Sequence, residues 1–272
     1  MIARPYLAAA VSMTSTPDFE VNLRHAEGLI AEAARRGAEL VGLPENFPQI
    51  CESSHEVAEQ VSTTYPRAMA WLAEQAARHE IVLYAGVIAP PAEGSTRVRN
   101  VLVVFGRDGR EIARYQKRHM FDVYFGDGNT FVESETVEPG TEPVVADLGE
   151  LGKLGLSICY DLRFPEHFRA LVDQGADLLT VPAAFLTKTG MDHWHVLLRA
   201  RAIENTSYLL APAQGGRHNA KRASYGHALV VDPWGHVLAD TGDVPGVAIA
   251  PIDSQRLQTV REQLPCLRHR LY

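Results

Sequence analysis

Residues 154–181 read LGLSICYDLRFPEHFRALVDQGADLLTV and contain the clearest pattern of secondary structure in the chain. The apolar run over 154–159 predicts a buried strand, Pro165 favours the first turn of a helix, and Gly175 fits the end of that helix. A second apolar run over 177–181 predicts the next strand. Strand, helix and strand in this order are typical of a sheet that is covered by helices.

The same alternation continues on both sides of this stretch. Helix starts are predicted at Asp18, after Pro17, and at Pro66, because these residue types suit the beginning of a helix. No linker or internal repeat interrupts the alternation, so a single domain over residues 1–272 is predicted. The remaining patterns predict strands over 5–12, 39–43, 81–88, 207–211 and 247–252, and helices over 191–204 and 254–264.

Two hairpins and one long loop interrupt the regular pattern. Asp-Gly at 108–109 joins two strand-like runs over 98–105 and 111–117, and a second hairpin is predicted over 228–239. Residues 118–142 are rich in turn-forming residues, so we expect a long functional loop there. Hairpins inserted into a strand–helix alternation predict mixed sheets covered by helices.

The composition is that of a globular protein and excludes several classes. The 272 residues are 46% hydrophobic and 22% charged, with a net charge of −7 from 26 basic and 33 acidic residues. Nucleic-acid binding needs a basic footprint, and the longest basic cluster, at 217–222, is too short to supply one. No apolar run approaches the ~20 residues that a membrane span requires. Three cysteines make no disulfide framework, which favours a reducing, cytoplasmic setting.

Common cofactor and metal motifs are absent from the sequence. It contains no glycine-rich dinucleotide or phosphate loop, no G-x-S-x-G nucleophile turn and no H-E-x-x-H zinc motif. His193 and His195 form an H-x-H pair, but residues two apart on a helix face different sides. We therefore expect no metal site.

Cys159 is the first candidate catalytic residue. It ends a predicted strand just before a polar turn and a helix, a position at which α/β sheets carry their sites. Backbone N–H groups after it can point at a developing oxyanion. The alternative is a buried structural cysteine, which residue type and spacing taken alone favour.

Two charged residues occupy comparable positions. Glu45 follows the predicted strand over 39–43, and Lys117 ends the second strand of the first hairpin. Each taken alone is best explained as an ordinary surface charge. Because three strand ends in one sheet system can converge on one pocket, the three side chains together favour a functional site.

A series of motifs runs along nearly the whole chain. They are Gly42-Leu43-Pro44-Glu45-Asn46, Tyr115 to Asp122, Ile158 to Glu166, His193-Trp194, Leu198 to Asn205, Ser224 to His227 and Val231 to Gly235. In this order they resemble the nitrilase superfamily of carbon–nitrogen hydrolases. Within it, residues 213–218 and 221–227 look most like the Nit branch, especially its deaminated glutathione amidases, and less like its ω-amidases.

The resemblance implies a fold and a catalytic mechanism. The fold is a four-layer αββα sandwich of the α/β class with mixed sheets, and the motifs place a catalytic triad at Glu45, Lys117 and Cys159. Glu133 matches a second family glutamate that orients the lysine and assists at the substrate. Lys117 and the backbone N–H of Tyr160 would bind the oxyanion. A cysteine thioester would form and be hydrolysed by water, with no metal or organic cofactor.

The resemblance also implies a substrate and an assembly. The substrate is a small anionic amide, foremost deaminated glutathione, which would give 2-oxoglutarate and Cys-Gly; ω-amidase substrates, N-carbamoyl compounds and other small amides are the alternatives. Arg163, Arg217 and Arg222 are candidates for binding its carboxylates, or else structural or solvated arginines. A homodimer or higher homo-oligomer is expected, without nucleic acid or membrane as a partner.

Several alternatives stay open. A Cys–His pair would use a histidine in place of the lysine, and His227 is the best candidate. A catalytically silent member serving as an interaction module is the alternative from a different class, although the intact triad argues against it. Two departures from the branch, the run over 124–128 and His195 where a glutamate is commoner, concern the substrate more than the chemistry.

Overall fold

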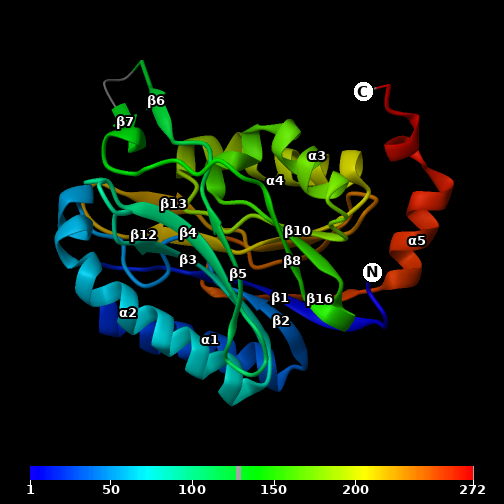
Figure 1. The fold of residues 1–272 in the computed structure, drawn as a ribbon, viewed down its shortest axis with the longest axis horizontal. Helices are drawn as coiled ribbons and strands as arrows, with labels where there is room; N and C mark the ends of the chain where they lie inside the picture. The colour runs from blue at the N-terminus through cyan, green and yellow to red at the C-terminus, as the bar shows by residue number, and fades with distance from the viewer. Residues whose placement is uncertain (127–129, 272) are drawn as a thin grey trace.

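The computed structural model describes residues 1–126 and 130–271, which form a four-layer αββα sandwich (Figure 1). This confirms the predicted fold class. Helices α1 (Phe19–Arg35) and α2 (Ser54–His79) cover one sheet, and α3 (Pro165–Asp173) and α4 (Thr187–Asn205) cover the other. Helix α5 (Ser254–Gln263) lies at one end of the sandwich. None of the described helices combines the length and apolarity that crossing a membrane requires.

Within the described residues, the first sheet has eight strands and the second has six. The first runs in the order β13 (Ala223–Tyr225), β12 (Ala213–Arg217), β1 (Tyr6–Met13), β2 (Ala38–Gly42), β3 (Val82–Ala89), β4 (Arg99–Phe105) and β5 (Glu111–Gln116), with β16 (Gly246–Ile252) paired to β1. The second runs in the order β15 (Val237–Asp240), β14 (Leu229–Val231), β11 (Tyr208–Ala211), β10 (Leu178–Thr180), β9 (Lys153–Leu156) and β8 (Val144–Asp147).

Both sheets are mixed, as expected. Strands β1, β2 and β3 run parallel to one another, as do β9, β10 and β11, whereas β16 and the edge strands β5 and β8 pair antiparallel with their neighbours. A separate hairpin of β6 (Asp122–Tyr124) and β7 (Thr130–Val132) projects beyond the sandwich (Figure 1).

Strand β1 shows how the two-residue period of a strand builds both cores. Ala9 and Val11 enter an apolar cluster that includes Leu23 of α1. Ala8 and Ala10 point the other way, into the core that joins the two sheets. Because successive side chains alternate between faces and both faces are covered, this strand is a continuous apolar run.

Helix α1 begins where the sequence predicts because Asp18 caps it. The Asp18 carboxylate accepts the backbone N–H of Val21 at 2.9 Å, which satisfies one of the unpaired donors of the first turn. Gly37 has a φ of +87°, a conformation that costs glycine little. The chain can therefore turn directly from the helix into β2.

Helix α2 corrects one prediction, because it begins at Ser54 and carries Pro66 in its interior. The start is fixed by Ser53, whose hydroxyl accepts the backbone N–H of Glu56 and also contacts the Glu56 carboxylate, each at 3.3 Å. Pro66 lies on the exposed side of the helix, where the carbonyl left without its N–H partner can bond water. The Ser-x-x-Glu capping pattern at 53–56 is present in the sequence, but Pro66 is the stronger sign of a helix start.

Other boundaries also differ from the prediction. Helix α4 begins at Thr187 rather than at 191, and β9 ends at Leu156 rather than at Cys159. Strands β8, β12 and β13 were not predicted, because they are short and β12 contains two glycines, Gly215 and Gly216. The expected loop over 118–142 contains β6 and β7.

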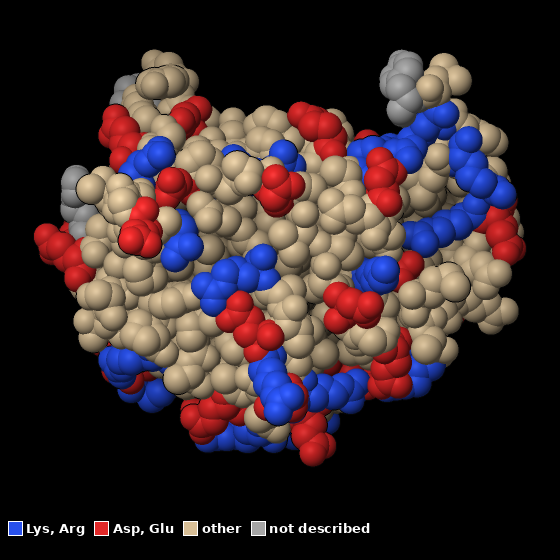
Figure 2. All heavy atoms as spheres, viewed as in Figure 1, with Lys and Arg blue, Asp and Glu red and all other residues tan. Residues whose placement is uncertain are grey.

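Charged side chains of both signs are interspersed over the face drawn in Figure 2. Basic side chains gather on this face along α5 and the segment that follows it, which includes Arg268 and Arg270. Apart from this basic strip, the described residues of this face mix charges of both signs.

Candidate active site

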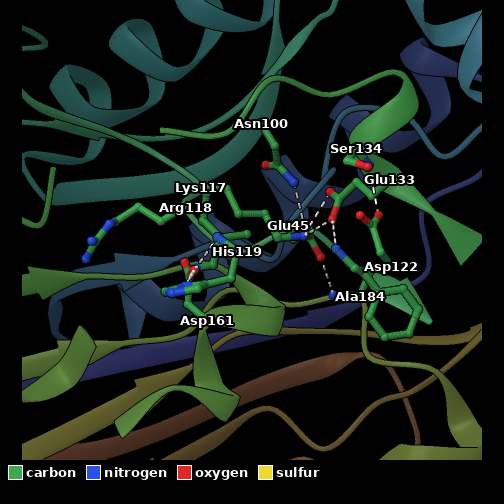
Figure 3. Close-up of polar contacts among 12 residues, drawn as sticks. Glu45, Asn100, Lys117, Arg118, His119, Asp122, Glu133, Ser134, Asp161 and Ala184 are labelled. Atoms are coloured by element: carbon green, nitrogen blue, oxygen red, sulfur yellow. Dashed lines mark hydrogen bonds and ion pairs between the residues drawn. The ribbon is translucent and has the colours of Figure 1, made fainter. Parts of the chain in front are cut away.

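Glu45 lies on the turn after β2, with its side chain buried inside the sandwich. One carboxylate oxygen, Oε1, accepts the Asn100 amide at 2.7 Å and the Lys117 ammonium at 3.2 Å (Figure 3). The other, Oε2, accepts the backbone N–H of Ala184, after β10, at 2.9 Å. Glu45 follows a strand of the first sheet and Ala184 follows a strand of the second, so the two sheets meet at this carboxylate.

A glycine makes room for the Glu45 backbone. A Cβ atom at Gly86, in β3, would lie 2.7 Å from the Glu45 Cα, which is closer than real Cβ contacts allow. Asn46, the next residue in the chain, has a φ of +55°, which asparagine tolerates better than most residues. These two local features fix the position from which the Glu45 side chain points inward.

Lys117 follows β5 and is also buried. Its Nζ atom lies 2.9 and 2.8 Å from the two carboxylate oxygens of Glu133, as well as 3.2 Å from Glu45 (Figure 3). Glu133 begins a short 3₁₀ helix directly after β7 and also accepts the backbone N–H of Phe121 at 2.7 Å. The hairpin of β6 and β7 thus delivers the carboxylate that orients the lysine.

Cys159 begins a 3₁₀ turn (Cys159–Arg163) between β9 and α3. Its φ is +48°, a left-handed conformation that is strained for this residue type, and its N–H donates to the Pro182 carbonyl at 3.0 Å. Such strain persists only where the surroundings enforce it, and it concentrates at functional sites. The N–H of Tyr160 donates to no acceptor in the described part of the chain, so it is available to a ligand.

Asp161 holds the cysteine turn against β5, a role that the sequence analysis did not assign. Its fully buried carboxylate accepts the Ile158 N–H at 2.8 Å and the Tyr115 hydroxyl at 2.7 Å. It also bonds to the His119 backbone N–H at 3.1 Å and to the His119 ring at 2.6 Å (Figure 3). Its place two residues after Cys159, in the same quoted motif, was the available signal.

The charges of the cluster set its protonation state. Burial alone would raise the pKa of Glu45, but the Lys117 ammonium, the Arg222 guanidinium and hydrogen bonding hold it below its usual value. Burial alone would lower the pKa of Lys117, but the carboxylates of Glu133 and Glu45 raise it. Burial and the Glu45 charge raise the pKa of the Cys159 thiol well above its usual value, although Lys117 opposes them. The resting cluster therefore holds a neutral thiol, a carboxylate and an ammonium.

This arrangement can perform nucleophilic chemistry. The Cys159 thiol interacts with both the Glu45 carboxylate and the Lys117 ammonium. A carboxylate next to a thiol can remove its proton, and an ammonium can stabilise the negative charge that results. The structure thus brings the three predicted triad residues together, with Glu133 beside the lysine.

The three candidate arginines differ in their surroundings. Arg222 is charged, close enough to lower the pKa of Glu45, and its buried Nε has no acceptor among the described residues. Arg163 lies 5.6 Å from the ring centre of Tyr160 and 5.2 Å from that of Phe185. Arg217 is exposed and donates only to the carbonyl of Ala220 in its own turn, at 3.4 Å. Arg222 and Arg163 therefore lie beside the cluster, whereas no described contact brings Arg217 to it.

The histidine alternative has a different neighbourhood. The Nδ1 atom of His227 lies 3.1 Å from both carboxylate oxygens of Asp240, and its ring stacks on Tyr225. No contact in the described part of the chain joins His227 to Cys159. The geometry thus favours Lys117 over His227 as the partner of the cysteine.

Aromatic side chains of the β6–β7 hairpin lie next to the cysteine turn. Phe121 packs edge-on against Tyr160 at 5.2 Å between ring centres and contacts Phe131 at 5.6 Å. The expectation that the 122–131 segment borders the pocket falls partly on residues 127–129, which lie outside the described residues. A cavity of about 360 Å³ lies elsewhere, along β5 and the segment before β8.

The comparison with protein families and the comparison with known sequences agree with each other. Residues 7–262 match the carbon-nitrogen hydrolase family. The chain is 49% identical to deaminated glutathione amidase from Synechocystis sp. over 271 residues, which is 99% of each chain.

Solved structures agree with these sequence relatives. The Caenorhabditis elegans NitFhit protein matches with a TM-score of 0.94 and 39% identity over 100% of this chain and 66% of its own. A mutant of the amidase from Nesterenkonia sp. AN1, with acrylamide added at its active-site cysteine, matches with a TM-score of 0.79 and 27% identity, over 96% of this chain and 98% of its own.

Proposed function

This chain belongs to the carbon–nitrogen hydrolase family, and we propose that it is an amidase with Cys159 as its nucleophile, Glu45 as its general base and Lys117 as its electrostatic partner. The observation that carries the proposal is the buried ion pair of Lys117 and Glu45, at 3.2 Å, whose two charges both act on the pKa of the Cys159 thiol. We further propose that residues 1–272 form one carbon–nitrogen hydrolase domain.

The first chemical step forms a bond between sulfur and carbon. Glu45 takes the thiol proton while the Cys159 sulfur attacks the carbonyl carbon of the amide, and the carbonyl electron pair moves to oxygen. The protonated Glu45 is neutral, so its attraction for Lys117 falls. An N–H of the ammonium is then released to face the new oxyanion.

The oxyanion is stabilised by two donors. The proposed donors are the Lys117 ammonium, which acts on the Cys159 thiol, and the backbone N–H of Tyr160, the next residue in the chain. One such donor is typically worth about 3–4 kcal/mol of the activation barrier. Glu133 holds Lys117 in place through two hydrogen bonds, so it acts as a positioning residue in this step.

The remaining steps restore the enzyme. Glu45 gives its proton to the leaving nitrogen, the carbon–nitrogen bond breaks, and a thioester remains on Cys159. Glu45 then deprotonates a water molecule, which attacks the thioester. The carbon–sulfur bond breaks, the sulfur regains a proton, and the carboxylic acid product leaves.

The proposed substrate is a small anionic amide, and deaminated glutathione is the first candidate, giving 2-oxoglutarate and Cys-Gly. The likeness to deaminated glutathione amidase over the full length supports this choice. Arg222, with an unpaired buried Nε beside Glu45, is the best placed of the three arginines to bind a carboxylate.

A panel assay tests the proposal. Deaminated glutathione, α-ketoglutaramate and an N-carbamoyl amino acid are compared by kcat/KM, with Cys159→Ala as the inactive control and mass spectrometry to detect the thioester. The highest value for deaminated glutathione supports the first candidate, and a higher value for α-ketoglutaramate indicates an ω-amidase instead. No turnover of any amide, together with a Cys159 thiol that iodoacetamide cannot alkylate, would favour a catalytically silent interaction module.

We also propose a cytoplasmic homodimer. Helix α4 exposes large apolar side chains, including Met191 at 67% and Val196 at 65%, which a second copy of the chain could cover. Light scattering of the purified protein at micromolar concentration tests the assembly, and a monomer would contradict it.

A further inference from the structure

Three side chains from separate elements meet outside the proposed active site: His195 in α4, His227 in the turn between β13 and β14, and Asp240 at the end of β15. We call them the histidine cluster. The Nε2 atom of His195 lies 3.0 Å from the Asp240 carboxylate, and Nδ1 of His227 lies 3.1 Å from it. One ligand atom from each of the three residues lies within 4.8 Å of the other two.

The backbone fixes His227 in this cluster. It has a φ of +59°, which is uncommon for a residue with a side chain. Its N–H donates to the Gly242 carbonyl at 2.7 Å, and its carbonyl accepts the Trp194 indole N–H at 2.8 Å. Its ring stacks on Tyr225, with 4.4 Å between the ring centres. The imidazole is therefore held in one orientation before any ligand arrives.

The Asp240 carboxylate is also held. Its Oδ1 accepts the backbone N–H of Gly242 at 2.8 Å, the same glycine whose carbonyl binds His227. Side chains of the cluster remain 22–32% exposed, so an ion and its water ligands can reach them. Positioned ligands with an open approach are what a metal site requires.

We propose that the histidine cluster binds a divalent transition-metal ion, and that Zn²⁺ fits it best. Two imidazole nitrogens and one carboxylate oxygen are ligands that Zn²⁺ prefers over Mg²⁺ or Ca²⁺. Ligand atoms about 2.0–2.2 Å from a tetrahedral zinc ion lie roughly 3.3–3.6 Å from one another. The two imidazole–carboxylate distances, 3.0 and 3.1 Å, are a few tenths of an ångström shorter than this spacing.

The ion would act on structure rather than on the chemistry of the proposed active site. None of the described contacts of His195, His227 or Asp240 reaches Glu45, Lys117 or Cys159. A bound ion would instead join α4 to the β14–β15 hairpin and to the turn before it.

The neighbouring histidine is not part of this site. His193, the other half of the H-x-H pair, lies against Arg163, with its Nδ1 atom 3.4 Å from the guanidinium. The sequence expectation of no metal rested on the absence of common metal motifs and on the separation of His193 from His195, and that separation is observed. The partners that complete a site for His195 come instead from 32 and 45 residues further along the chain.

Zinc titration tests the proposal. Metal-free protein carrying Cys159→Ala, which removes a competing thiol ligand, is titrated with ZnCl₂ in a calorimeter. We expect one ion per chain and a rise in Tm on adding zinc. His195→Gln and Asp240→Asn should each weaken binding by at least about tenfold and abolish the rise in Tm, because each removes one of three ligands.

A matched control identifies the site. His193→Gln removes a neighbouring, exposed imidazole that the proposal excludes, and it should leave the zinc affinity and the Tm shift unchanged. Circular dichroism checks that every variant is folded. Failure of the parent to bind zinc, or equal binding by the parent and both cluster variants, would overturn the proposal.

Discussion

The proposed active site and the histidine cluster both place a carboxylate between two nitrogen-bearing side chains, but they differ in burial. In the first, the side chains of Glu45 and Lys117 are 3% and 2% exposed. In the histidine cluster, those of His195 and Asp240 are 32% and 29% exposed. Similar contacts therefore differ in electrostatic strength, because water screens the charges of the histidine cluster and is excluded from those of the proposed active site.

The difference has a chemical consequence. In the buried cluster, each charge depends on its partners, since an unpaired ion in the interior is costly. That dependence is what holds a carboxylate ionised next to a neutral thiol. In the histidine cluster, water can replace any partner, so the groups are available to an added ion.

The largest effect is expected from Lys117→Met. It leaves the carboxylates of Glu45 and Glu133 without their cation, which should lower the free energy of unfolding by about 3–5 kcal/mol. Amide turnover should fall at least about 100-fold, because a donor to the oxyanion is lost. Urea unfolding and kcat measure the two effects.

Two controls sharpen this result. Lys153→Met, in β9, should change the free energy of unfolding by no more than about 0.5 kcal/mol. Adding Glu133→Gln to Lys117→Met should recover part of the lost stability, because it removes one of the two unpaired charges. No recovery would mean that the cluster is not coupled in the way the contacts indicate.

A smaller effect is expected from Asp161→Asn. The amide cannot accept all the hydrogen bonds that the buried carboxylate receives from Ile158, Tyr115 and His119, so stability should fall by about 1–3 kcal/mol. Because Asp161 positions the cysteine turn and is itself fully buried, kcat should fall more than KM changes. Loss of stability with unchanged kcat would assign Asp161 a purely structural role.

The thiol predicts a pH dependence of stability. Burial raises the pKa of Cys159 above its unfolded value of about 8.5, so its contribution is fully present below that pH and is lost as pH rises toward the folded pKa. The decline in stability above about pH 8.5 should thus be shallower in Cys159→Ala, as measured by urea unfolding. Cys266→Ala, at a half-buried position, is the matched control and should keep the parent's decline.

The smallest effect is expected from Asp240→Asn in metal-free protein. Its ion pairs are partly exposed, so the free energy of unfolding should change by less than about 1 kcal/mol. The same carboxylate-to-amide change at Asp161 is therefore the direct comparison. Equal losses of unfolding free energy at Asp161 and Asp240 would contradict the idea that burial determines the size of the effect.

Sequence reasoning could predict the proposed triad because each member follows a strand within a motif that resembles the nitrilase superfamily. Glu45, Lys117 and Cys159 come from separate stretches, and the structure brings their side chains together. Asn100 was missed because an amide inside an apolar strand carries no motif of its own. The contact from Ala184 was missed because a backbone N–H has no sequence signature at all.

The limits of the fold prediction have a similar cause. Helix α2 was placed too late because Pro66 outweighed the capping residues at 53–56, and only its exposed position makes the proline acceptable. The histidine cluster was not predictable, since its members lie far apart in the sequence and lack the spacing of a metal motif. The start of α2 and the histidine cluster both depend on which side chains face water in the folded chain. Local sequence patterns do not contain that information.

The hydrogen bond from Ala184 to Glu45 has a practical consequence for trapping ligands. Glu45 joins the end of a strand in the first sheet to the end of a strand in the second. In an inactive Glu45→Gln protein this contact between the sheets would be altered, so substrate would bind to a changed site. Cys159→Ala removes only a small thiol group and leaves the Glu45 side chain that accepts the Ala184 N–H in place. Crystals grown with an uncleaved amide should therefore use the cysteine variant, whose pocket keeps the shape of the working enzyme.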